Sequence, residues 1–295
     1  MKRSKYTFAL LALILGYALV GTAIAPMLTF TYKDVKAKGA VETDTYGIND
    51  SGAIAGDFVD SSAVQHLMIL KGTKLTKLDD KNCSTTPGAA GPAFYGINSA
   101  GTAVGWCTSA TSGEPIGLMY AKGKLTEFTV PKALETEGTG INDKGDIVGA
   151  FFDTAGAEHG FLLHAKKYTQ LDAPKDSSTV AWDINNKGQI TVYATNSSGF
   201  LDAFLLTGKT YKNIDVPTAE DTYAHSLNNK GDIDGTYIDS TGTEKGWLLH
   251  GGKYYDVVDP GGVTRADGLN DKITIVGRYG SGTYGGTGFE ATTKP

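Results

Sequence analysis

The stretch TGINDKGDIVGAFFDTAGAEHGFLLHAKKYTQLDAP, residues Thr139–Pro174, decides the fold. The Asn-Asp-Lys-Gly cluster at 142–145 marks a reverse turn, because Asn and Asp side chains bond to nearby backbone and Gly readily adopts positive φ. Around this turn lie four short segments that are rich in β-branched and aromatic residues: 139–142, 146–152, 160–164 and 168–172. The stretch therefore predicts four consecutive antiparallel strands joined by tight turns.

The same pattern occurs six times along the chain, and each copy is centred on an Asn that follows Leu or Ile. These marker residues are Asn49, Asn98, Asn142, Asn185, Asn228 and Asn270, separated by 49, 44, 43, 43 and 42 residues. A period in the low forties that carries about four strands is typical of a β-propeller blade. We therefore predict an all-β fold, a six-bladed β-propeller.

A Gly stands seven residues after the marker Asn in five of the six copies, and Val192 takes its place in the fourth copy. The five glycines are Gly56, Gly105, Gly149, Gly235 and Gly277. A Gly inside a strand favours the close approach of a neighbouring backbone. We expect that contact within each blade.

The last copy supplies only three strands before the chain ends at Pro295, so its fourth strand must come from elsewhere. Tyr32-Lys33-Asp34-Val35 matches the fourth-strand segment Tyr211-Lys212-Asn213-Ile214. We expect this N-terminal strand to complete the last blade, because a closed ring leaves no free sheet edge there. Residues 26–295 would then form a single domain whose first strands line a central channel.

The N-terminus has the pattern of a secretory signal peptide over residues 1–25, with three basic residues before an apolar run that ends in small residues. Cleavage fits after Ala23 or after Ala25. The alternative is an uncleaved apolar anchor over residues 8–25, at the lower length limit for a membrane span. The segment predicts a protein that is secreted, periplasmic or held at the cell envelope.

Without residues 1–25 the chain has 24 Lys and Arg against 32 Asp and Glu, a net charge of −8. This balance argues against nucleic acid and, beyond the signal segment, against membrane surfaces as partners. Only two arginines remain, Arg265 and Arg278. Nothing in the sequence calls for a cofactor, and we expect a monomer.

The two cysteines, Cys83 and Cys107, both lie in the second repeat region. In an oxidising compartment they would form a disulfide that pins the longest link between blades to its neighbouring blade. The alternative is a pair of unpaired thiols.

Two elements of the third copy carry a resemblance to a known family. They are Gly140-Ile141-Asn142-Asp143-Lys144-Gly145 with Val148-Gly149, and His159-Gly160-Phe161. In these residues the chain resembles the HAF family of probable extracellular repeat proteins, and the resemblance covers essentially everything after the signal segment. It implies an exported, propeller-like protein and brings no established activity with it.

Acidic residues cluster in the expected connections between a fourth strand and the next first strand. Glu42, Glu135 and Asp221 stand seven residues before a marker Asn, and Asp44, Glu137 and Glu220 lie beside them. We expect them to surround one channel mouth, with Arg265 as the lone cation nearby. Such carboxylates could bind a cation or an amine, or act as acid and base on a sugar. The alternative is that they are solvated loop residues.

Aromatic residues near the starts of the first strands form a second candidate surface: Tyr46, Phe94, Tyr95, Trp182 and Tyr223. They could stack on carbohydrate above the channel, or they could pack in the core. His225 is the one histidine expected on a first strand, and it is a candidate for ligand contact. The other four histidines form two pairs, His66 with His159 and His164 with His250. The members of each pair occupy equivalent places in separate blades, which does not favour a shared zinc ion.

The marker Asn residues and the Asn-Asp-Lys-Gly-Asp turns have simpler explanations than ligand binding. A turn needs such residues for its own backbone bonds. A calcium loop would need further oxygens and a bidentate acid at fixed offsets, and none follows here. We expect solvated turns and no metal site.

The sequence therefore favours an exported binding or scaffold module for a glycan, peptide or protein ligand. No arrangement of nucleophile, base and orienting group is evident. One alternative is a hydrolase or lyase that uses the acidic channel mouth, and another is a purely structural surface protein.

Overall fold

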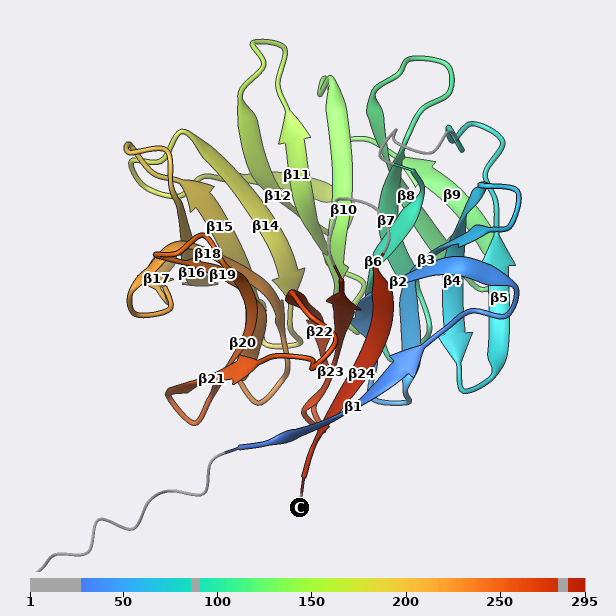
Figure 1. The fold of residues 1–295 in the computed structure, drawn as a ribbon. Helices are drawn as coiled ribbons and strands as arrows, with labels where there is room; N and C mark the ends of the chain where they lie inside the picture. The colour runs from blue at the N-terminus through green and yellow to red at the C-terminus, as the bar shows by residue number, and fades with distance from the viewer. Residues whose placement is uncertain (1–27, 86–90, 281–285, 295) are drawn as a thin grey trace, which may run out of the picture.

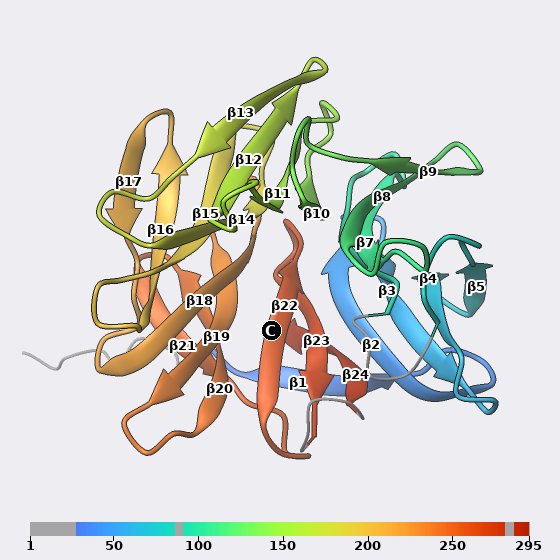
Figure 2. The ribbon, with the colours of Figure 1, turned by 90° about the horizontal axis from the view of Figure 1, so that it is seen from above.

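The computed structural model describes residues 28–85, 91–280 and 286–294. These residues form 24 strands and no helix, and the strands are grouped as blades around a central axis (Figures 1 and 2). The fold is the all-β propeller that the repeats predict. The proposed signal peptide lies outside the described residues. No helix in the described part of the chain has the length and apolarity that a membrane crossing requires.

Each blade is an antiparallel sheet whose strands follow one another outward from the axis. Blade 1 comprises β2 (Ala40–Ile48), β3 (Ala53–Asp60), β4 (Gln65–Lys71) and β5 (Lys74–Leu78). Blade 2 comprises β6 (Ala93–Ile97), β7 (Ala103–Thr108), β8 (Pro115–Ala121) and β9 (Lys124–Phe128). Blade 3 comprises β10 (Glu135–Ile141), β11 (Ile147–Phe152), β12 (Glu158–His164) and β13 (Lys167–Leu171). Blade 4 comprises β14 (Ser178–Ile184), β15 (Gln189–Thr195), β16 (Leu201–Thr207) and β17 (Thr210–Asn213). Blade 5 comprises β18 (Ala219–Leu227), β19 (Ile233–Asp239), β20 (Glu244–His250) and β21 (Lys253–Val257).

The sixth blade closes the ring with strands from both ends of the chain. It contains β22 (Thr264–Leu269), β23 (Thr274–Tyr279) and β24 (Thr287–Thr293), and its outermost strand is β1 (Phe30–Val35). β1 runs antiparallel to β24, in a register from Phe30 opposite Thr293 to Val35 opposite Gly288. Figure 2 shows the blue β1 beside the strands of this last blade. The predicted closure is confirmed.

The repeated Gly lies where the first and second strands of a blade come closest. A Cβ at Gly149 would stand 1.8 Å from the Glu137 carbonyl oxygen, and one at Gly56 would stand 2.0 Å from that of Asp44. The first strand bulges just beyond this point, between Gly138 and Gly140 in blade 3. The expected close approach of backbones is therefore present, and at these glycines a Cβ would need the strands to move; blade 4 instead accommodates Val192 at the equivalent position.

The marker Asn residues join the blades to one another as well as shaping the turns. In blade 2 the Asn98 Oδ1 accepts hydrogen bonds from the Ala100 and Thr102 N–H groups at 3.1 and 3.0 Å. Its Nδ2 donates to the Asn142 carbonyl oxygen, 3.1 Å away. Equivalent Nδ2 bonds run from each marker Asn to the next, and the Asn270 Nδ2 bond to the Asn49 oxygen completes the circle. The sequence predicted the turn role and did not reveal this ring.

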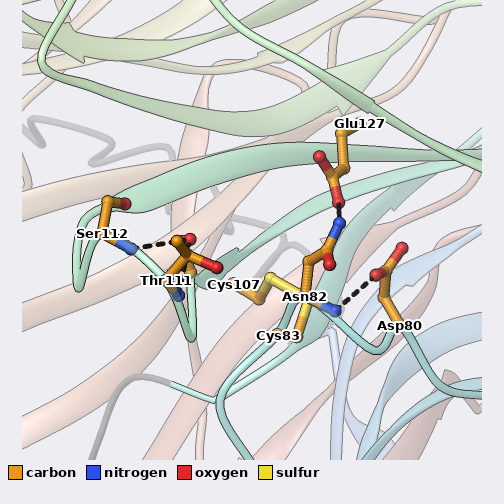
Figure 3. Close-up of a disulfide and its surroundings, with 8 residues drawn as sticks. Asp80, Asn82, Cys83, Cys107, Thr111, Ser112 and Glu127 are labelled. Carbon is orange, nitrogen blue, oxygen red and sulfur yellow. Dashed lines mark hydrogen bonds between the residues drawn. A yellow bond between two sulfur atoms is a disulfide. The ribbon is translucent and has the colours of Figure 1, made fainter.

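The structure contains the Cys83–Cys107 disulfide, with Cα atoms 5.7 Å apart (Figure 3). Cys83 belongs to the link between β5 and β6, and Cys107 belongs to β7. Both are buried among apolar residues shared by blades 1 and 2. The Asn82 side chain also donates to Glu127 at 2.7 Å. The disulfide therefore fixes the link to blade 2, as expected.

Candidate ligand-binding site at the channel mouth

One residue per blade stands three positions before the marker Asn on the innermost strand. The six are Tyr46, Tyr95, Thr139, Trp182, His225 and Asp267. All of them except Thr139 line a cavity of about 290 Å³ at the axis, which we call the mouth cavity. It lies on the side of the Asn ring where the innermost strands begin.

Two further positions of the repeat complete the wall of the mouth cavity. Tyr223 and Arg265 stand five residues before a marker Asn, on β18 and β22. Tyr193, Thr236 and Arg278 stand eight residues after one, on the second strands β15, β19 and β23. Ile238 and Glu244 of blade 5 are the remaining lining residues. Identical positions in a closed ring converge on the axis, so residues far apart in sequence share one wall.

Aromatic rings form a continuous surface over much of this wall. The Tyr95 ring centroid lies 4.6 Å from that of Tyr46 and 5.7 Å from that of Trp182. Trp182 continues to His225 at 5.0 Å and to Tyr193 at 5.7 Å. Such rings offer flat apolar faces together with polar edges. The surface suits a ligand that combines apolar faces with hydroxyl groups.

A basic side chain lies against the aromatic surface. The Arg278 Nη1 donates a hydrogen bond of 2.5 Å to the Tyr46 hydroxyl, and its guanidinium carbon lies 5.0 Å from the Tyr46 ring centroid. Arg265, in contrast, is engaged with an acid, because its Nε lies 2.5 Å from Glu244 Oε1.

Two buried oxygen atoms of the wall have no hydrogen-bond partner among the described residues. They are Oδ2 of Asp267 and Oγ1 of Thr236, on side chains that are 4% and 1% exposed. The other Asp267 oxygen lies 3.2 Å from His225 Nδ1, which is also 2.8 Å from the Ala266 carbonyl oxygen. Burial lowers the pKa of His225, so the ring is neutral near pH 7. Leaving a buried polar atom unpaired costs about 1–3 kcal/mol, and a bound ligand could recover it.

Buried carboxyl groups lie close to the arginine. Burial raises the pKa of Asp57 well above its usual value, and the charge of Asp44 adds to this shift. Burial also raises the pKa of Asp44, although Arg278 opposes the effect. In blade 3, burial and the charges of Glu158 and Glu135 raise the pKa of Glu137 to about 7. At each of these positions the surroundings shift the carboxyl group toward its neutral form.

Six of the residues singled out from the sequence meet in the mouth cavity: Tyr46, Tyr95, Trp182, Tyr223, His225 and Arg265. Asp44 lies near it, within the electrostatic reach of Arg278. The remaining acids do not line it. Asp221 accepts a hydrogen bond from the Leu201 N–H at 2.7 Å. Glu135 lies beside Glu114, and burial and that neighbour raise its pKa.

The placement of the acids in connecting loops was wrong. Glu42 and Asp44 belong to β2, Glu135 and Glu137 to β10, and Glu220 and Asp221 to β18. These innermost strands begin seven to nine residues before the marker Asn, because their first residues already pair with the far end of the second strand. Glu135, for example, pairs with Phe152, the last residue of β11. The acids are therefore members of a sheet, and all of them except the exposed Glu220 are partly buried.

One further expectation about this mouth was wrong. Arg265 is not the lone cation, since Arg278 also lines the mouth cavity. For Phe94 the core-packing alternative holds: it is fully buried between blades 1 and 2, because adjacent strand residues face opposite ways and its neighbour Tyr95 faces the axis. Sequence reasoning also missed Tyr193, Thr236 and Asp267, which counting from the marker Asn in both directions could have found.

The other histidines each pair with acids of their own blade. His66 lies 3.1 Å from Asp60 and 2.5 Å from Asp79. His159 occupies the same place in blade 3, with Asp172 at 2.7 Å. Within the described ranges, no three His, Cys, Asp or Glu side chains gather closely enough to hold a metal ion.

No protein-family model matches the chain, and no curated protein sequence matches it. Several solved structures share its fold at low sequence identity. TolB from Acinetobacter baumannii is 12% identical with a TM-score of 0.58, and the match covers 83% of this chain and 64% of that one. A mutant of AofleA from Arthrobotrys oligospora is 12% identical with a TM-score of 0.54, over 91% and 88%. The SapL1 lectin, in complex with α-methyl fucoside, is 10% identical with a TM-score of 0.53, over 84% and 91%. These likenesses show the β-propeller fold.

Proposed function

We propose that this protein is a binding module that holds the terminal residue of a glycan in the mouth cavity. The observation that carries the proposal is the combination of Trp182 and its aromatic neighbours with the unpartnered oxygens of Asp267 and Thr236. A sugar ring can stack on an aromatic face while its hydroxyl groups pair with buried polar atoms.

The size of the cavity supports a small occupant. Ligand pockets usually measure about 300–1,000 Å³, and the mouth cavity of about 290 Å³ lies just below that range. This favours one ring-sized group over a long segment of chain. The SapL1 lectin, which has a similar fold, is a propeller that holds a sugar derivative, and this also supports a glycan over a peptide.

We also propose that the protein acts outside the cytoplasm, at the cell envelope or beyond it. The N-terminal pattern and the resemblance to HAF repeats support export. The Cys83–Cys107 disulfide supports it independently, because disulfides persist mainly in oxidising compartments.

Trp182→Ala should weaken glycan binding roughly 30-fold, about 2 kcal/mol, because it removes the central ring of the aromatic surface. A glycan array would first identify a ligand, and calorimetry would then compare the variants. Tyr168→Ala is the matched control, since it removes a half-buried ring from the outermost strand of blade 3. Unchanged affinity in a folded Trp182→Ala protein would contradict the proposed site, and an array without any ligand would contradict the function.

The pKa of Glu137, about 7, favours a hydrolase or lyase as the second candidate function. A carboxyl group that is half protonated near neutral pH can both donate and accept a proton. If it acts as the acid, turnover of a polysaccharide should fall as the pH rises above about 7, and Glu137→Gln should abolish it. The exposed Glu127→Gln is the control. Release of sugar ends at an equal rate by the Glu137→Gln variant would exclude this role.

A further inference from the structure

Arg278 is the least satisfied charged side chain of the mouth cavity. A guanidinium carries five N–H donors, and the one hydrogen bond that this group makes to a described residue goes to the Tyr46 hydroxyl. No ion pair among the described residues involves Arg278, whereas Arg265 of the same cavity is paired with Glu244. Arg278 therefore presents unused donors and a positive charge to the cavity that it lines.

Two acids act on Arg278 through their charge, Asp267 and Asp44, but neither forms an ion pair with it among the described residues. The burial of Asp57 raises its pKa well above the usual value and so favours its uncharged form. Burial raises the pKa of Asp44 as well. One oxygen of Asp267 lies 3.2 Å from His225 Nδ1. No acid of the described residues therefore occupies the guanidinium directly.

We propose that the ligand of this cavity is an acidic sugar whose carboxylate is bound by Arg278. The inference rests on the proposed glycan binding and names its class. A guanidinium holds a carboxylate through two parallel N–H···O bonds, which match its planar fork of donors. The other arginine that lines this cavity, Arg265, already binds the Glu244 carboxylate through Nε and Nη2.

The remaining wall fits the other parts of a uronic acid. Asp267 Oδ2 has no hydrogen-bond partner among the described residues and could accept a hydrogen bond from a sugar hydroxyl. Thr236 Oγ1 can donate or accept. The Trp182 face would lie under the sugar ring. In this arrangement Arg278 would bind the carboxylate, and Asp267 and Thr236 would bind hydroxyl groups.

The test compares matched sugars on protein expressed from the full chain. Calorimetry would measure oligosaccharides that end in glucuronic or galacturonic acid, the same chains ending in glucose or galactose, and the methyl esters of the acids. We expect the free acids to bind at least about tenfold more tightly than the neutral sugars and the esters. Arg278→Gln should remove this preference and leave the weaker neutral binding, while Lys245→Gln, at a paired surface lysine, should keep it.

The outcomes separate the two proposals. Equal affinity of the wild-type protein for acid, ester and neutral sugar would overturn the acidic-sugar inference and leave glycan binding intact. No measurable affinity for any of them, or for any glycan on the array, would overturn both. If Arg278→Gln fails to fold, the comparison of acid with ester on the wild-type protein still decides, because the ester keeps the shape and removes the charge.

Discussion

Val35→Asp is expected to lower the free energy of unfolding by about 3 kcal/mol or more. Val35 ends β1 and is 6% exposed, and it packs in the apolar cluster that joins the last blade to the first, beside Ile54 and Val276. The substitution removes apolar burial and places a charge in that cluster. Because β1 is the strand that closes the ring, its loss would also expose the edge of β24.

Thr31→Asp is the matched control, since it introduces the same charge on an exposed side chain of the same strand. Denaturant unfolding of the two variants and the wild-type protein would measure the difference, and light scattering would report aggregation through the free edge. Equal stability of the two variants would show that β1 contributes little to closing the ring. The arrangement of the blades around the mouth cavity would then be contradicted.

Asn98→Ala is expected to cost about 2–3 kcal/mol, because it removes one bond to the next blade and two bonds within its own turn. The buried Asn142 carbonyl oxygen would lose its side-chain donor. Lys212→Ala, at an exposed residue of the outermost strand of blade 4, should change stability by less than about 0.5 kcal/mol. Thermal and denaturant unfolding would measure both.

Asn98→Asp separates the two roles of the marker residue. An Asp keeps the acceptor that the turn needs and lacks the Nδ2 donor to the next blade. We expect it to lose at least half of the stability that Asn98→Ala loses. If Asn98→Asp is as stable as the wild-type protein, the marker Asn serves the turn alone, and the ring of bonds between blades adds nothing measurable.

Local chemistry made the blades predictable. The Asn-Asp-Lys-Gly turns and the alternating strands depend on neighbouring residues, so a regular period reveals them without knowledge of the fold. The closing strand could be found in the same way, because Tyr32–Val35 repeats the pattern of the other fourth strands. The close approach at Gly149 followed from the residue type alone. The signal peptide and the HAF resemblance stay predictions.

The candidate site was predictable only in part. Trp182, His225 and Arg265 stood out by type and by place on a first strand, and the structure brings them together. Arg278 did not stand out in the sequence, because it lies on a second strand and reaches the axis through the register of β23 against β22. Phe94 and Tyr95 are neighbours of similar type, and the sequence did not tell which one faces the channel.

By itself, the sequence determined the number of blades, the turns within them and the strand that closes the ring, because each depends on short-range chemistry repeated at a fixed spacing. The tertiary structure alone decided which side chains surround the mouth cavity and which polar atoms there lack partners. Those properties depend on bulges, strand register and ring closure, which bring together residues more than two hundred positions apart, such as Tyr46 and Arg278.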